Sequence, residues 1–535
     1  MFVNYLKVTF RNLLRHKTFS FINVFGLAVA MAVCMLIMLI IGDQKSYDRF
    51  QKNRDRIYRI ETTGKDGKGM RTATSALPLG ALLRTQYSGI EAAASLVKNI
   101  GGDLLYKDKI ASGGGYFADD NLFRVMDFQL ERGDTATALA KPFTMVISKE
   151  IADQLFRGQD PIGKTISFND TGINPSGPET GNKETPYGRF TITGVLRPNP
   201  GKTSLPFKLL ASLSSLPELT RDSILNYPPD NWDNVWSNYT YVLMEKGRSQ
   251  AYLQQVLDRV SAGQYPKGAP DQFAFHAVAL TDIMPADPIG NPTNTGMPKL
   301  VLYVLSVLCL IVMLSACLNY TNLSIARQLT RAKEVGIRKT SGATRGQIFT
   351  QFISEAVTMS LVSLVVSFGI VLFFQHLFAG LWLNRFLSIS FHYTPGLVLL
   401  FIGFAIVVGI VAGLLPSLYM SLFNPINILK GLNHFKMFKR LTVRRILLVT
   451  QFCVSLVFII STSLIYLQGD HILNFNYGFD KDNVVNIKMF KAENYPRFLQ
   501  AISQSRYIDA VSTCAFLPAT GTDMATQVRP AANLK

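Results

Sequence analysis

The sequence has few residues of the kinds that bind metals or form disulfides, with five cysteines and six histidines among 535 residues. Four cysteines lie inside long apolar runs and one stands alone in polar surroundings, while the histidines are scattered (Cys34, Cys309, Cys317, Cys453 and Cys514; His16, His276, His376, His392, His434 and His471). Disulfide frameworks and metal sites need grouped ligands at recurring spacings. The sequence therefore predicts no disulfide framework, no metal site and no cofactor.

Charged residues are also scarce, at 17%, while 48% of the residues are hydrophobic. This composition is typical of a membrane protein and argues against an ordinary soluble chain. The formal net charge is nevertheless +18. A protein that binds nucleic acid would cluster lysine and arginine on a soluble fold, but here the densest clusters flank apolar runs. We therefore expect anionic membrane lipids, and no nucleic acid, as the partner of the excess positive charge.

Five apolar runs are long enough to cross a hydrocarbon core, which needs about 20 helical residues. The predicted spans are 19–41, 300–323, 356–374, 397–415 and 446–467. The first is too long for the apolar region of a signal peptide and has no cleavage site after it, so we predict an uncleaved signal anchor. The fold class is an α-helical transmembrane bundle of about five spans.

Residues 1–18 are predicted to form an amphipathic helix on the cytoplasmic surface of the membrane. Basic side chains recur every four residues on one face, and apolar side chains occupy another (Lys7, Arg11 and Arg15; Phe2, Leu6, Phe10 and Leu13). A helix that lies on an anionic surface needs this separation of faces.

Basic residues predict the orientation of the spans. They are concentrated before the first span, between the second and third, and between the fourth and fifth (Lys7, Arg11, Arg15 and Lys17; Arg327, Arg331, Lys333, Arg338, Lys339 and Arg345; Lys430, Lys436, Lys439, Arg440, Arg444 and Arg445). The connection 384–395 carries only Arg385. Loops rich in lysine and arginine stay in the cytoplasm. The N-terminus and both basic loops are therefore predicted to be cytoplasmic, and residues 43–298 and 468–535 to lie outside.

Segment 43–298 is long enough to bury a core of its own. The β-type runs TMVIS (144–148), KTISF (164–168) and RFTITGVL (189–196) alternate with the helical run KEIADQLF (149–156). This alternation predicts an α+β extracytoplasmic domain inserted between spans 1 and 2. Residues 169–188, rich in glycine, proline, asparagine and threonine, are predicted to form a loop between strands.

The run GQDPIGKT (158–165) matches the nucleotide-binding pattern G-x-x-x-x-G-K-[ST]. In that motif a strand leads into the loop and a helix leaves it, so that the N-terminus of the helix points at phosphate. Here the order is reversed, because a helical run precedes the motif and a strand-like run follows it. Pro161 also removes one backbone donor. We therefore predict a tight turn between helix and strand, with no ATPase site and no catalytic residues.

The informative cytoplasmic stretch is residues 319–356. Ser341 and Gly342 offer a helix stop, and Thr344 to Gln347 has the spacing of a capping box that begins the next helix. We expect a short helix over 333–339 at the membrane surface. Its basic residues are explained by topology alone, but together with Glu334 they could also pair with the charges of a partner.

The run RAKEVGIRKTSGATRGQIFTQFISEA (331–356) resembles the hallmark segment of the MacB/FtsX-type ABC transporter permeases, a family of macrolide exporters, lipoprotein-release permeases and the cell-division protein FtsX. YFADDNLFRVMDFQLERGD (116–134), ISKEIADQLFRGQDPIGKTISF (147–168) and FTITGVLRPNP (190–200) resemble the extracytoplasmic domain of that family. AGLLPSLYMSLFNPINILKG (412–431) resembles the end of its last core span. The resemblance covers most of the chain.

The resemblance implies that residues 331–343 form a coupling helix that docks into a groove on a separate cytoplasmic ABC ATPase subunit. The residues in this role are Arg331, Lys333, Glu334, Gly336, Ile337, Arg338, Lys339, Gly342 and Ala343. The resemblance further implies a MacB-like domain over 43–298, an FtsX-like domain over 300–431 and a multi-pass location in the bacterial inner membrane, with the large domain periplasmic. A dimer or second permease half and a periplasmic adaptor are further partners consistent with it.

The pattern at the N-terminus, a basic flank followed by an apolar span and a polar segment, repeats after the fourth span. RRILLVTQFCVSLVFIISTSLIYLQ (444–468) repeats the basic flank and the span, and NYGFDKDNVVNI (476–487) resembles the opening of a second extracytoplasmic domain. Relatives with this plan carry a complete second half with three further spans. Residues 468–535 are therefore expected to be the incomplete start of a second domain, in a truncated chain.

Three functions are compatible with these patterns. The first is export or extrusion of a drug, peptide or lipid-linked molecule. In this family, closure of a partner ATPase is expected to move the external domain, a mechanism termed mechanotransmission. The second is regulation without transport, in which the external domain activates a cell-wall hydrolase or a sensor kinase. The third, which the reversed order of helix and strand around the motif argues against, is an enzyme with its own ATPase site at 158–165.

Overall fold

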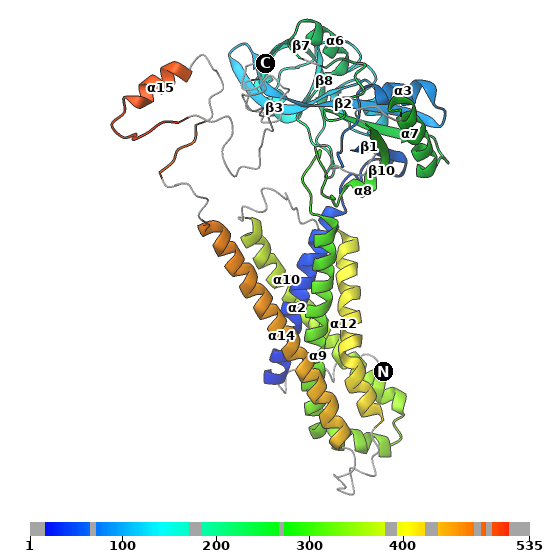
Figure 1. The fold of residues 1–535 in the computed structure, drawn as a ribbon. Coiled ribbons are helices and arrows are strands. Elements are labelled where there is room, and N and C mark those ends of the chain that lie inside the picture. Colours follow the sequence, from blue (N-terminus) through cyan, green and yellow to red (C-terminus); the bar gives the residue numbers. More distant parts are fainter. Residues whose placement is uncertain are drawn as a thin grey trace, which may run out of the picture.

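The apolar runs and the large polar segment form two distinct parts, a helix bundle and a sheet domain (Figure 1). This computed structural model describes residues 17–64, 71–170, 185–225, 227–266, 272–379, 393–422, 437–475, 483–487 and 495–512. The sheet domain, residues 45–298, lies at one end of the bundle, where helix α2 (Lys17–Gln44) enters it and helix α9 (Lys299–Thr340) leaves it. The amphipathic helix predicted over 1–18 lies outside the described residues, apart from the first two residues of α2.

Among the described residues, five helices are long and apolar enough to cross a membrane. They are α2, α9, α10 (Arg345–Ala379), α12 (Pro395–Ser421) and α14 (Met437–Asn474). Each contains one predicted span and extends past both of its ends, because hydropathy marks only the apolar middle of a helix. The first four pack around a shared core, whereas α14 contacts α9 and none of its membrane-length stretch is buried.

Helix α9 corrects the prediction of a separate short helix over 333–339. It runs without interruption from Lys299 to Thr340, a length of 42 residues. At about 1.5 Å per residue, α9 is roughly 63 Å long. The sequence from 324 to 340 contains no proline. Its single glycine, Gly336, costs only about 1 kcal/mol relative to alanine, which is too little to end a helix when Val335 beside it is buried.

Helices α10 and α12 approach each other closely at small residues. A Cβ added to Gly409 would lie 2.6 Å from the Cα of Val357, and one added to Gly413 would lie 2.6 Å from the Cβ of Ala356. Two glycines four residues apart allow the backbones of neighbouring membrane helices to touch. The hydroxyl of Ser360 on α10 also donates to the carbonyl of Ala405 on α12, at 2.6 Å.

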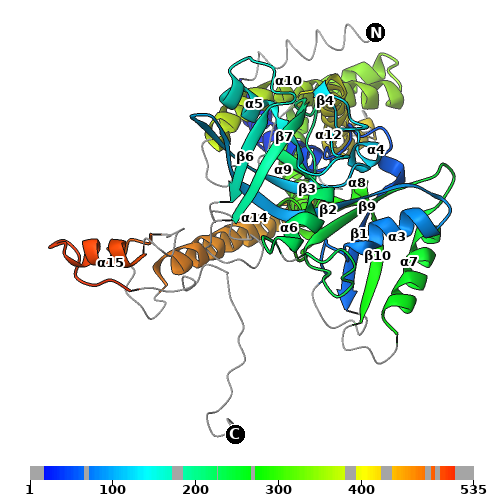
Figure 2. The same ribbon diagram turned by 90° about the horizontal axis from the view of Figure 1, so that it is seen from above.

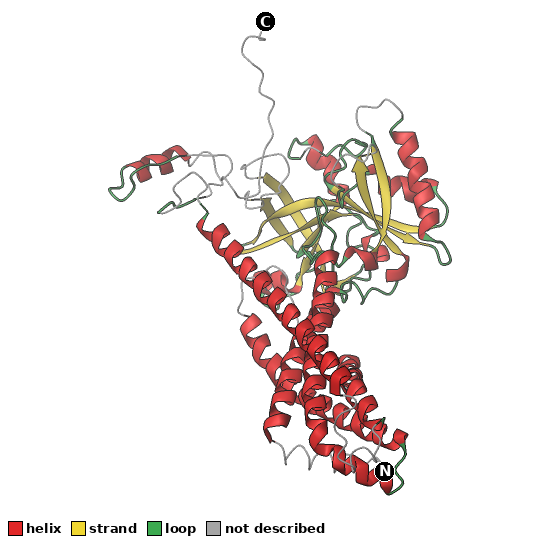
Figure 3. Ribbon diagram, turned by 60° about the horizontal axis from the view of Figure 1, so that its bottom comes forward, coloured by secondary structure: helices red, strands yellow, loops and turns green. Residues whose placement is uncertain are grey.

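Within the described residues, the sheet domain contains one ten-stranded mixed sheet of order β10-β1-β9-β2-β3-β8-β5-β7-β4, with β6 paired to β2 and β7. Its strands are β1 (Ile57–Gly64), β2 (Ile90–Tyr106), β3 (Lys109–Ala118), β4 (Leu130–Gly133), β5 (Thr144–Ser148), β6 (Thr165–Asp170), β7 (Thr185–Leu196), β8 (Leu209–Ser212), β9 (Asn238–Met244) and β10 (Phe273–Ala279). The pairs β3–β8 and β5–β7 are parallel, and the other pairs are antiparallel. Figure 3 shows the strands gathered in this domain and the long helices in the bundle.

The local predictions for this domain agree with the structure. The three β-type runs lie in strands β5, β6 and β7, and the helical run is α5 (Lys149–Phe156). The hydroxyl of Ser148 caps α5 by accepting from the N–H of Ile151. Strands β6 and β7 extend by a few residues into the predicted loop 169–188, of which residues 171–184 lie outside the described part.

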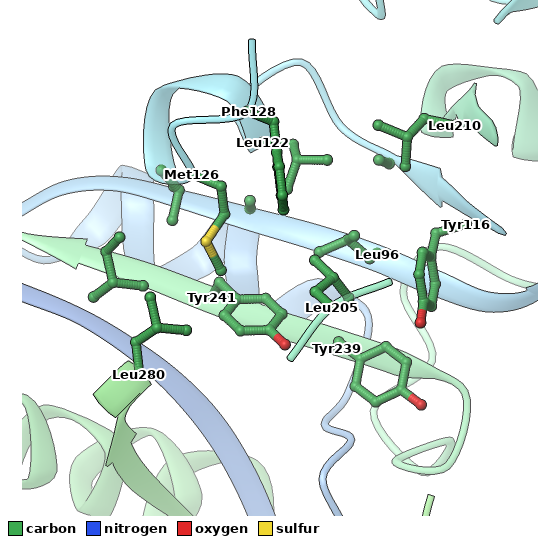
Figure 4. Close-up of a cluster of buried hydrophobic side chains, with 14 of the residues drawn as sticks. Leu96, Tyr116, Leu122, Met126, Phe128, Leu205, Leu210, Tyr239, Tyr241 and Leu280 are labelled. Atoms are coloured by element: carbon green, nitrogen blue, oxygen red, sulfur yellow. The ribbon is translucent and has the colours of Figure 1, made fainter. Parts of the chain in front are cut away.

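Helices cover the sheet in two places, seen from above in Figure 2. α3 (Pro78–Gln86) contacts β2 and β9, and α7 (Gln250–Gln264) contacts β10. α5 contacts β3 on the other side of the domain. Between these places, a cluster of buried side chains joins the central strands to the loops: Leu96, Tyr116, Leu122, Met126, Phe128, Leu205, Leu210, Tyr239, Tyr241 and Leu280 (Figure 4).

Little of the second domain predicted over 468–535 is described. Helix α14 continues to Asn474, and a short helix, α15 (Tyr495–Ser503), follows after a gap. Residues 476–482, 488–494 and 513–535 of this predicted domain lie outside the described residues.

Candidate functional site

The candidate site is the α9–α10 turn, residues 335–347, at the end of the bundle opposite the sheet domain (Figure 1). Helix α9 ends there in a Schellman motif. The N–H of Gly342 donates to the carbonyl of Lys339 at 3.2 Å, and the N–H of Ala343 donates to that of Arg338 at 3.0 Å. Gly342 has a φ of +97°, a left-handed conformation that favours glycine. The predicted helix stop is therefore confirmed.

Helix α10 begins with the predicted capping box. The N–H of Gln347 donates to the hydroxyl oxygen of Thr344 at 3.3 Å, and the N–H of Thr344 donates to the side-chain carbonyl of Gln347 at 2.9 Å. These reciprocal bonds satisfy two backbone donors that the first turn of a helix leaves without partners. The chain thus passes from one long helix to the next within four residues, 341–344.

A small apolar cluster holds the turn against α12. Val335, Ile348, Phe352 and Met420 are each at most 8% exposed and pack together with Ala343 and Tyr419. Ile348 and Phe352 are four residues apart and therefore share one face of α10. The cluster anchors the turn to three helices, so that α9, α10 and α12 meet at a single point.

Two basic side chains add polar links beneath the turn. The guanidinium of Arg338 donates to the side-chain carbonyl of Gln351 on α10 at 2.6 Å. The ammonium of Lys339 donates to the carbonyl of Ser421, the last residue of α12, at 2.7 Å. Cations are favoured there because the final carbonyls of a helix lack intrahelical partners. Burial, together with the charge of Arg345, lowers the pKa of Lys339.

The outward face of the turn carries one large apolar side chain. Ile337 is 63% exposed, while Val335 two residues earlier is buried. Its exposed neighbours Thr340, Ser341 and Thr344 are small and polar. The turn therefore presents an isoleucine on a rigid base, which is a shape that can insert into an apolar groove of another protein.

The nine residues assigned by resemblance fall into four groups. Arg338, Lys339, Gly342 and Ala343 hold the turn together through the bonds above, Ile337 points outward, and Gly336 lies on α9 between Val335 and Ile337. Arg331, Lys333 and Glu334 belong to the backbone of α9, but their side chains lie outside the described residues.

Several residues of the site were missed at the sequence level. The four-residue spacing of Ile348 and Phe352 after the capping box is a signal that could have found them. Met420 and Ser421 come from a segment about 80 positions away. No local pattern places the end of α12 beside the turn.

A pocket opens beside the turn between four helices. It is lined by Phe19 of α2, Tyr320, Ser324 and Arg327 of α9, Phe352, Glu355 and Met359 of α10, and Gly413 and Pro416 of α12. The guanidinium of Arg327 lies over the ring of Phe19, 4.5 Å from its centre. Arg327 and Glu355 thus face the interior of the bundle, as ionisable groups near a membrane usually do.

The P-loop-like run 158–165 lies in the sheet domain, far along the chain from this site. It joins α5 to β6, so a helix leads into it and a strand leaves it. The N–H of Gly163 donates to the carbonyl of Ile192, and that of Ile162 to the carboxylate of Asp160. Asp160 also pairs with Arg132 at 3.1 Å. The backbone donors at 159, 162, 163 and 164 are therefore bonded within the domain, in agreement with the predicted helix-to-strand turn.

Comparison with protein families gives two matches along the chain. The model of the MacB-like periplasmic core domain matches residues 20–260. The model of the FtsX-like permease C-terminal domain matches residues 306–425, which include the whole α9–α10 turn.

Curated relatives share low but extended identity. The macrolide export ATP-binding/permease protein MacB of Neisseria meningitidis is 23% identical over 439 residues, covering 80% of this chain and 61% of that protein. The uncharacterized ABC transporter permease YknZ of Bacillus subtilis is 23% identical over 318 residues, covering 58% of this chain and 68% of YknZ. The chain thus spans about three fifths of the length of the MacB relative.

Solved structures show weaker likeness. A domain of a putative permease from Porphyromonas gingivalis gives a TM-score of 0.34 at 17% identity, covering 48% of this chain and 98% of that one. The periplasmic region of MacB from Actinobacillus actinomycetemcomitans gives a TM-score of 0.29 at 14% identity, covering 41% of this chain and 87% of that one.

Proposed function

Because the chain belongs to the family of MacB/FtsX-type ABC transporter permeases, we propose that it couples ATP hydrolysis by a separate cytoplasmic ATPase to movements of its sheet domain. Permeases of this type work with ATPase partners in ABC systems. The apolar helices and the periplasmic-domain match make this chain an inner-membrane protein with a periplasmic domain. On this proposal, a displacement at the α9–α10 turn is transmitted to the sheet domain at the other end of the bundle.

The observation that carries the proposal is the continuity of α9. One unbroken helix links the α9–α10 turn to the sheet domain, and at about 1.5 Å per residue it spans roughly 63 Å. A helix transmits a push along its axis, whereas a flexible loop between a span and a docking helix would absorb it. The hydrogen bonds and the apolar cluster at the turn also favour transmission of the push along α9, because they resist a local deformation of the turn.

The distribution of basic residues supports a cytoplasmic position for the turn. Lys17 lies at the start of α2, and Arg327, Arg338, Lys339 and Arg345 lie at the same end of the bundle. Loops rich in lysine and arginine remain on the cytoplasmic side. On this proposal the N-terminus and the turn share a compartment with ATP, and the sheet domain is periplasmic.

Ile337 is proposed as the main apolar contact with the ATPase. Burying an isoleucine side chain contributes about 1.5–3 kcal/mol, and the small polar residues around Ile337 leave room for a groove to close over it. ATP binding can bias the sheet domain only by the difference in binding free energy between two arrangements of the complex. Coupling through Ile337 therefore requires that its contact with the ATPase differ between those arrangements.

We expect Ile337→Asp to abolish coupling without unfolding the chain. An exposed site tolerates the new carboxylate, but an apolar groove does not. The measurement is the hydrolysis rate of the ABC ATPase that co-purifies with the chain, in lipid nanodiscs, with and without the permease. Stimulation should fall at least about tenfold, which corresponds to roughly 1.4 kcal/mol of lost contact.

The matched control is Ile110→Asp. Ile110 is also 63% exposed, but it lies on β3 of the sheet domain. This variant should stimulate the ATPase normally. Equal stimulation by both variants would remove Ile337 from the contact, and loss of stimulation in both would point to a general effect of the added charge.

Export is proposed as the use of this coupling because MacB relatives are named as macrolide exporters. Uptake of a radiolabelled macrolide into inverted vesicles, with ATP and both subunits present, tests this directly. ATP-dependent domain movement without uptake, together with capture of a periplasmic cell-wall hydrolase or sensor kinase, would favour the regulatory alternative instead.

A further inference from the structure

Two acidic residues where α2 meets the sheet domain are buried in ordered polar contacts. Asp43 has a side chain only 2% exposed and pairs with the ammonium of Lys202, which lies 2.6 Å from its Oδ1 and 2.8 Å from its Oδ2. Lys202, in the loop after β7, also lies over the ring of Tyr47, 5.4 Å from its centre. The pair joins residues 159 positions apart in the sequence.

Gln44 extends the same contact to the segment that leads into α9. Its side-chain N–H donates to Asp43 at 3.2 Å, and its side-chain carbonyl accepts from the N–H of Met297 at 3.0 Å. Gln44 is fully buried. The last turn of α2 is thereby bonded to residues just before the first turn of α9.

Asp48 fixes the loop after β7 from the other side. Its carboxylate accepts from the N–H of Ser204 at 3.0 Å and from the hydroxyl of Thr203 at 2.8 Å. Its own N–H donates to the carbonyl of Lys202 at 2.8 Å. Asn294 donates to the carbonyl of Thr203 at 3.1 Å, which ties the approach to α9 to the same loop.

Loop 202–205 leads directly into the core of the sheet domain. Leu205 is 1% exposed and packs in the central apolar cluster, beside Leu96 and Tyr241 (Figure 4). The structure therefore connects both membrane helices that enter the domain to one loop, and connects that loop to the core. Beside these bonds, the ammonium of Lys299 at the start of α9 pairs with Asp287 of the domain at 3.0 Å, and Tyr47 after α2 packs in the domain core.

We propose that Asp43 and Lys202 form a clamp that makes the sheet domain move as one body with α2 and α9. The proposal rests on the proposed coupling function. It names the positioning residues that pass the movement of the helices on to the sheet domain. An axial or tilting displacement of the two helices is passed through the clamp to loop 202–205 and so to the core. If the clamp opens, the helices still move but the domain follows them less closely.

The burial of Asp43 makes its ion pair with Lys202 sensitive to a single substitution. The Asp43 side chain is 2% exposed and that of Lys202 is 19% exposed. Removing the Lys202 charge would leave a buried carboxylate without this cation, which is strongly unfavourable, and removing the Asp43 charge would release the Lys202 ammonium toward solvent. Exchanging the two charges restores a pair in the same place. The exchange therefore distinguishes the effect of the ion pair from the effect of the side-chain packing around it.

The test uses the full chain in nanodiscs with the co-purifying ATPase. A fluorescent donor is attached at Ile110→Cys, in a background without the five native cysteines, and an acceptor is placed in the lipid. Energy transfer reports the distance of the domain from the membrane. In the otherwise unchanged chain, ATP should alter the transfer. In Asp43→Asn the ATP-dependent change should fall at least fivefold while ATPase stimulation is kept, and Asp43→Lys with Lys202→Asp should recover the change.

Glu131→Gln is the matched control, because it breaks the Lys149–Glu131 pair, whose 2.8 Å distance is similar but whose side chains are 47% and 37% exposed. It should leave the movement intact. No ATPase stimulation by the unchanged chain would refute the coupling function itself. Full movement in Asp43→Asn would overturn the clamp alone. Loss of ATPase stimulation together with movement in Asp43→Asn would also overturn it, because the pair would then only support the fold.

Discussion

At the scale of single residues, Asp119 should make the stability of the sheet domain depend on pH. Its carboxylate accepts from the N–H groups of Ser95 and Asn121, both at 3.1 Å, and Arg84 lies 3.9 Å away. Burial outweighs these contacts and raises the pKa of Asp119 to about 7. An acid whose pKa is raised by folding binds more protons in the folded state. The free energy of unfolding therefore falls as the pH rises from about 4 to about 7.

We expect Asp119→Asn to remove this part of the pH dependence. Between about pH 5 and pH 7, the unchanged chain should lose about 1–3 kcal/mol of stability that the variant keeps. Thermal unfolding of the solubilised chain, followed by tryptophan fluorescence, measures the difference. Asp108→Asn, at an exposed position, is the control. If the unchanged chain and Asp119→Asn show the same pH slope, the Asp119 carboxylate is not protonated in this range.

Sequence reasoning succeeded for residues whose contacts are local. Thr344 and Gln347 are three positions apart, and Gly342 acts through its own backbone, so their patterns fix their roles before any fold is known. Asp43 and Lys202 are 159 positions apart, and neither stands in a motif. Their pairing follows from the meeting of α2 with the loop after β7, which depends on the folded domain.

At the scale of elements, Gly409 should govern the packing of α10 against α12. Its missing side chain leaves room for the backbone of Val357, and any Cβ there would lie 2.6 Å from that residue's Cα. Gly409→Leu must push the helices apart, which costs about 1–3 kcal/mol for an overpacked site. The melting temperature of the solubilised chain should fall accordingly.

Gly403→Leu on the same helix supplies the comparison. Nothing lies within 4 Å of a Cβ added there, and the residue is exposed. A leucine at this position should leave the melting temperature unchanged in detergent. Equal losses for both variants would mean that the contact with α10 does not set the cost, since leucine is a better helix former than glycine and helix propensity predicts no loss.

The five predicted spans all lie in long helices, but their predicted ends were wrong. Hydropathy located the apolar middle of each long helix, but polar residues at helix ends carry no such signal, and α9 therefore continued where a short separate helix was expected. The ends that were fixed by caps, at Gly342 and Thr344, were placed correctly. Helix boundaries are thus predictable where the sequence contains a capping motif.

At the scale of the whole molecule, the sheet order could not be derived from the sequence. β1 pairs with β9 and β10, and β2 pairs with β9, so strands from both ends of segment 43–298 lie side by side. Such pairings depend on packing between distant segments, and the alternation of strand-like and helical runs leaves many orders open. The same long-range closure brings the start and end of the domain to the two helices that carry it.

The proposed coupling requires the α9–α10 turn and the sheet domain to face opposite sides of the membrane. Cysteine labelling tests this most directly, in a chain without its native cysteines that carries a single probe at Gln159→Cys or Ser341→Cys, both exposed positions. In intact cells with a permeabilised outer membrane, a membrane-impermeant maleimide should label position 159, and should label position 341 only after the inner membrane is opened. Labelling of position 341 but not of position 159 in intact cells would contradict the account.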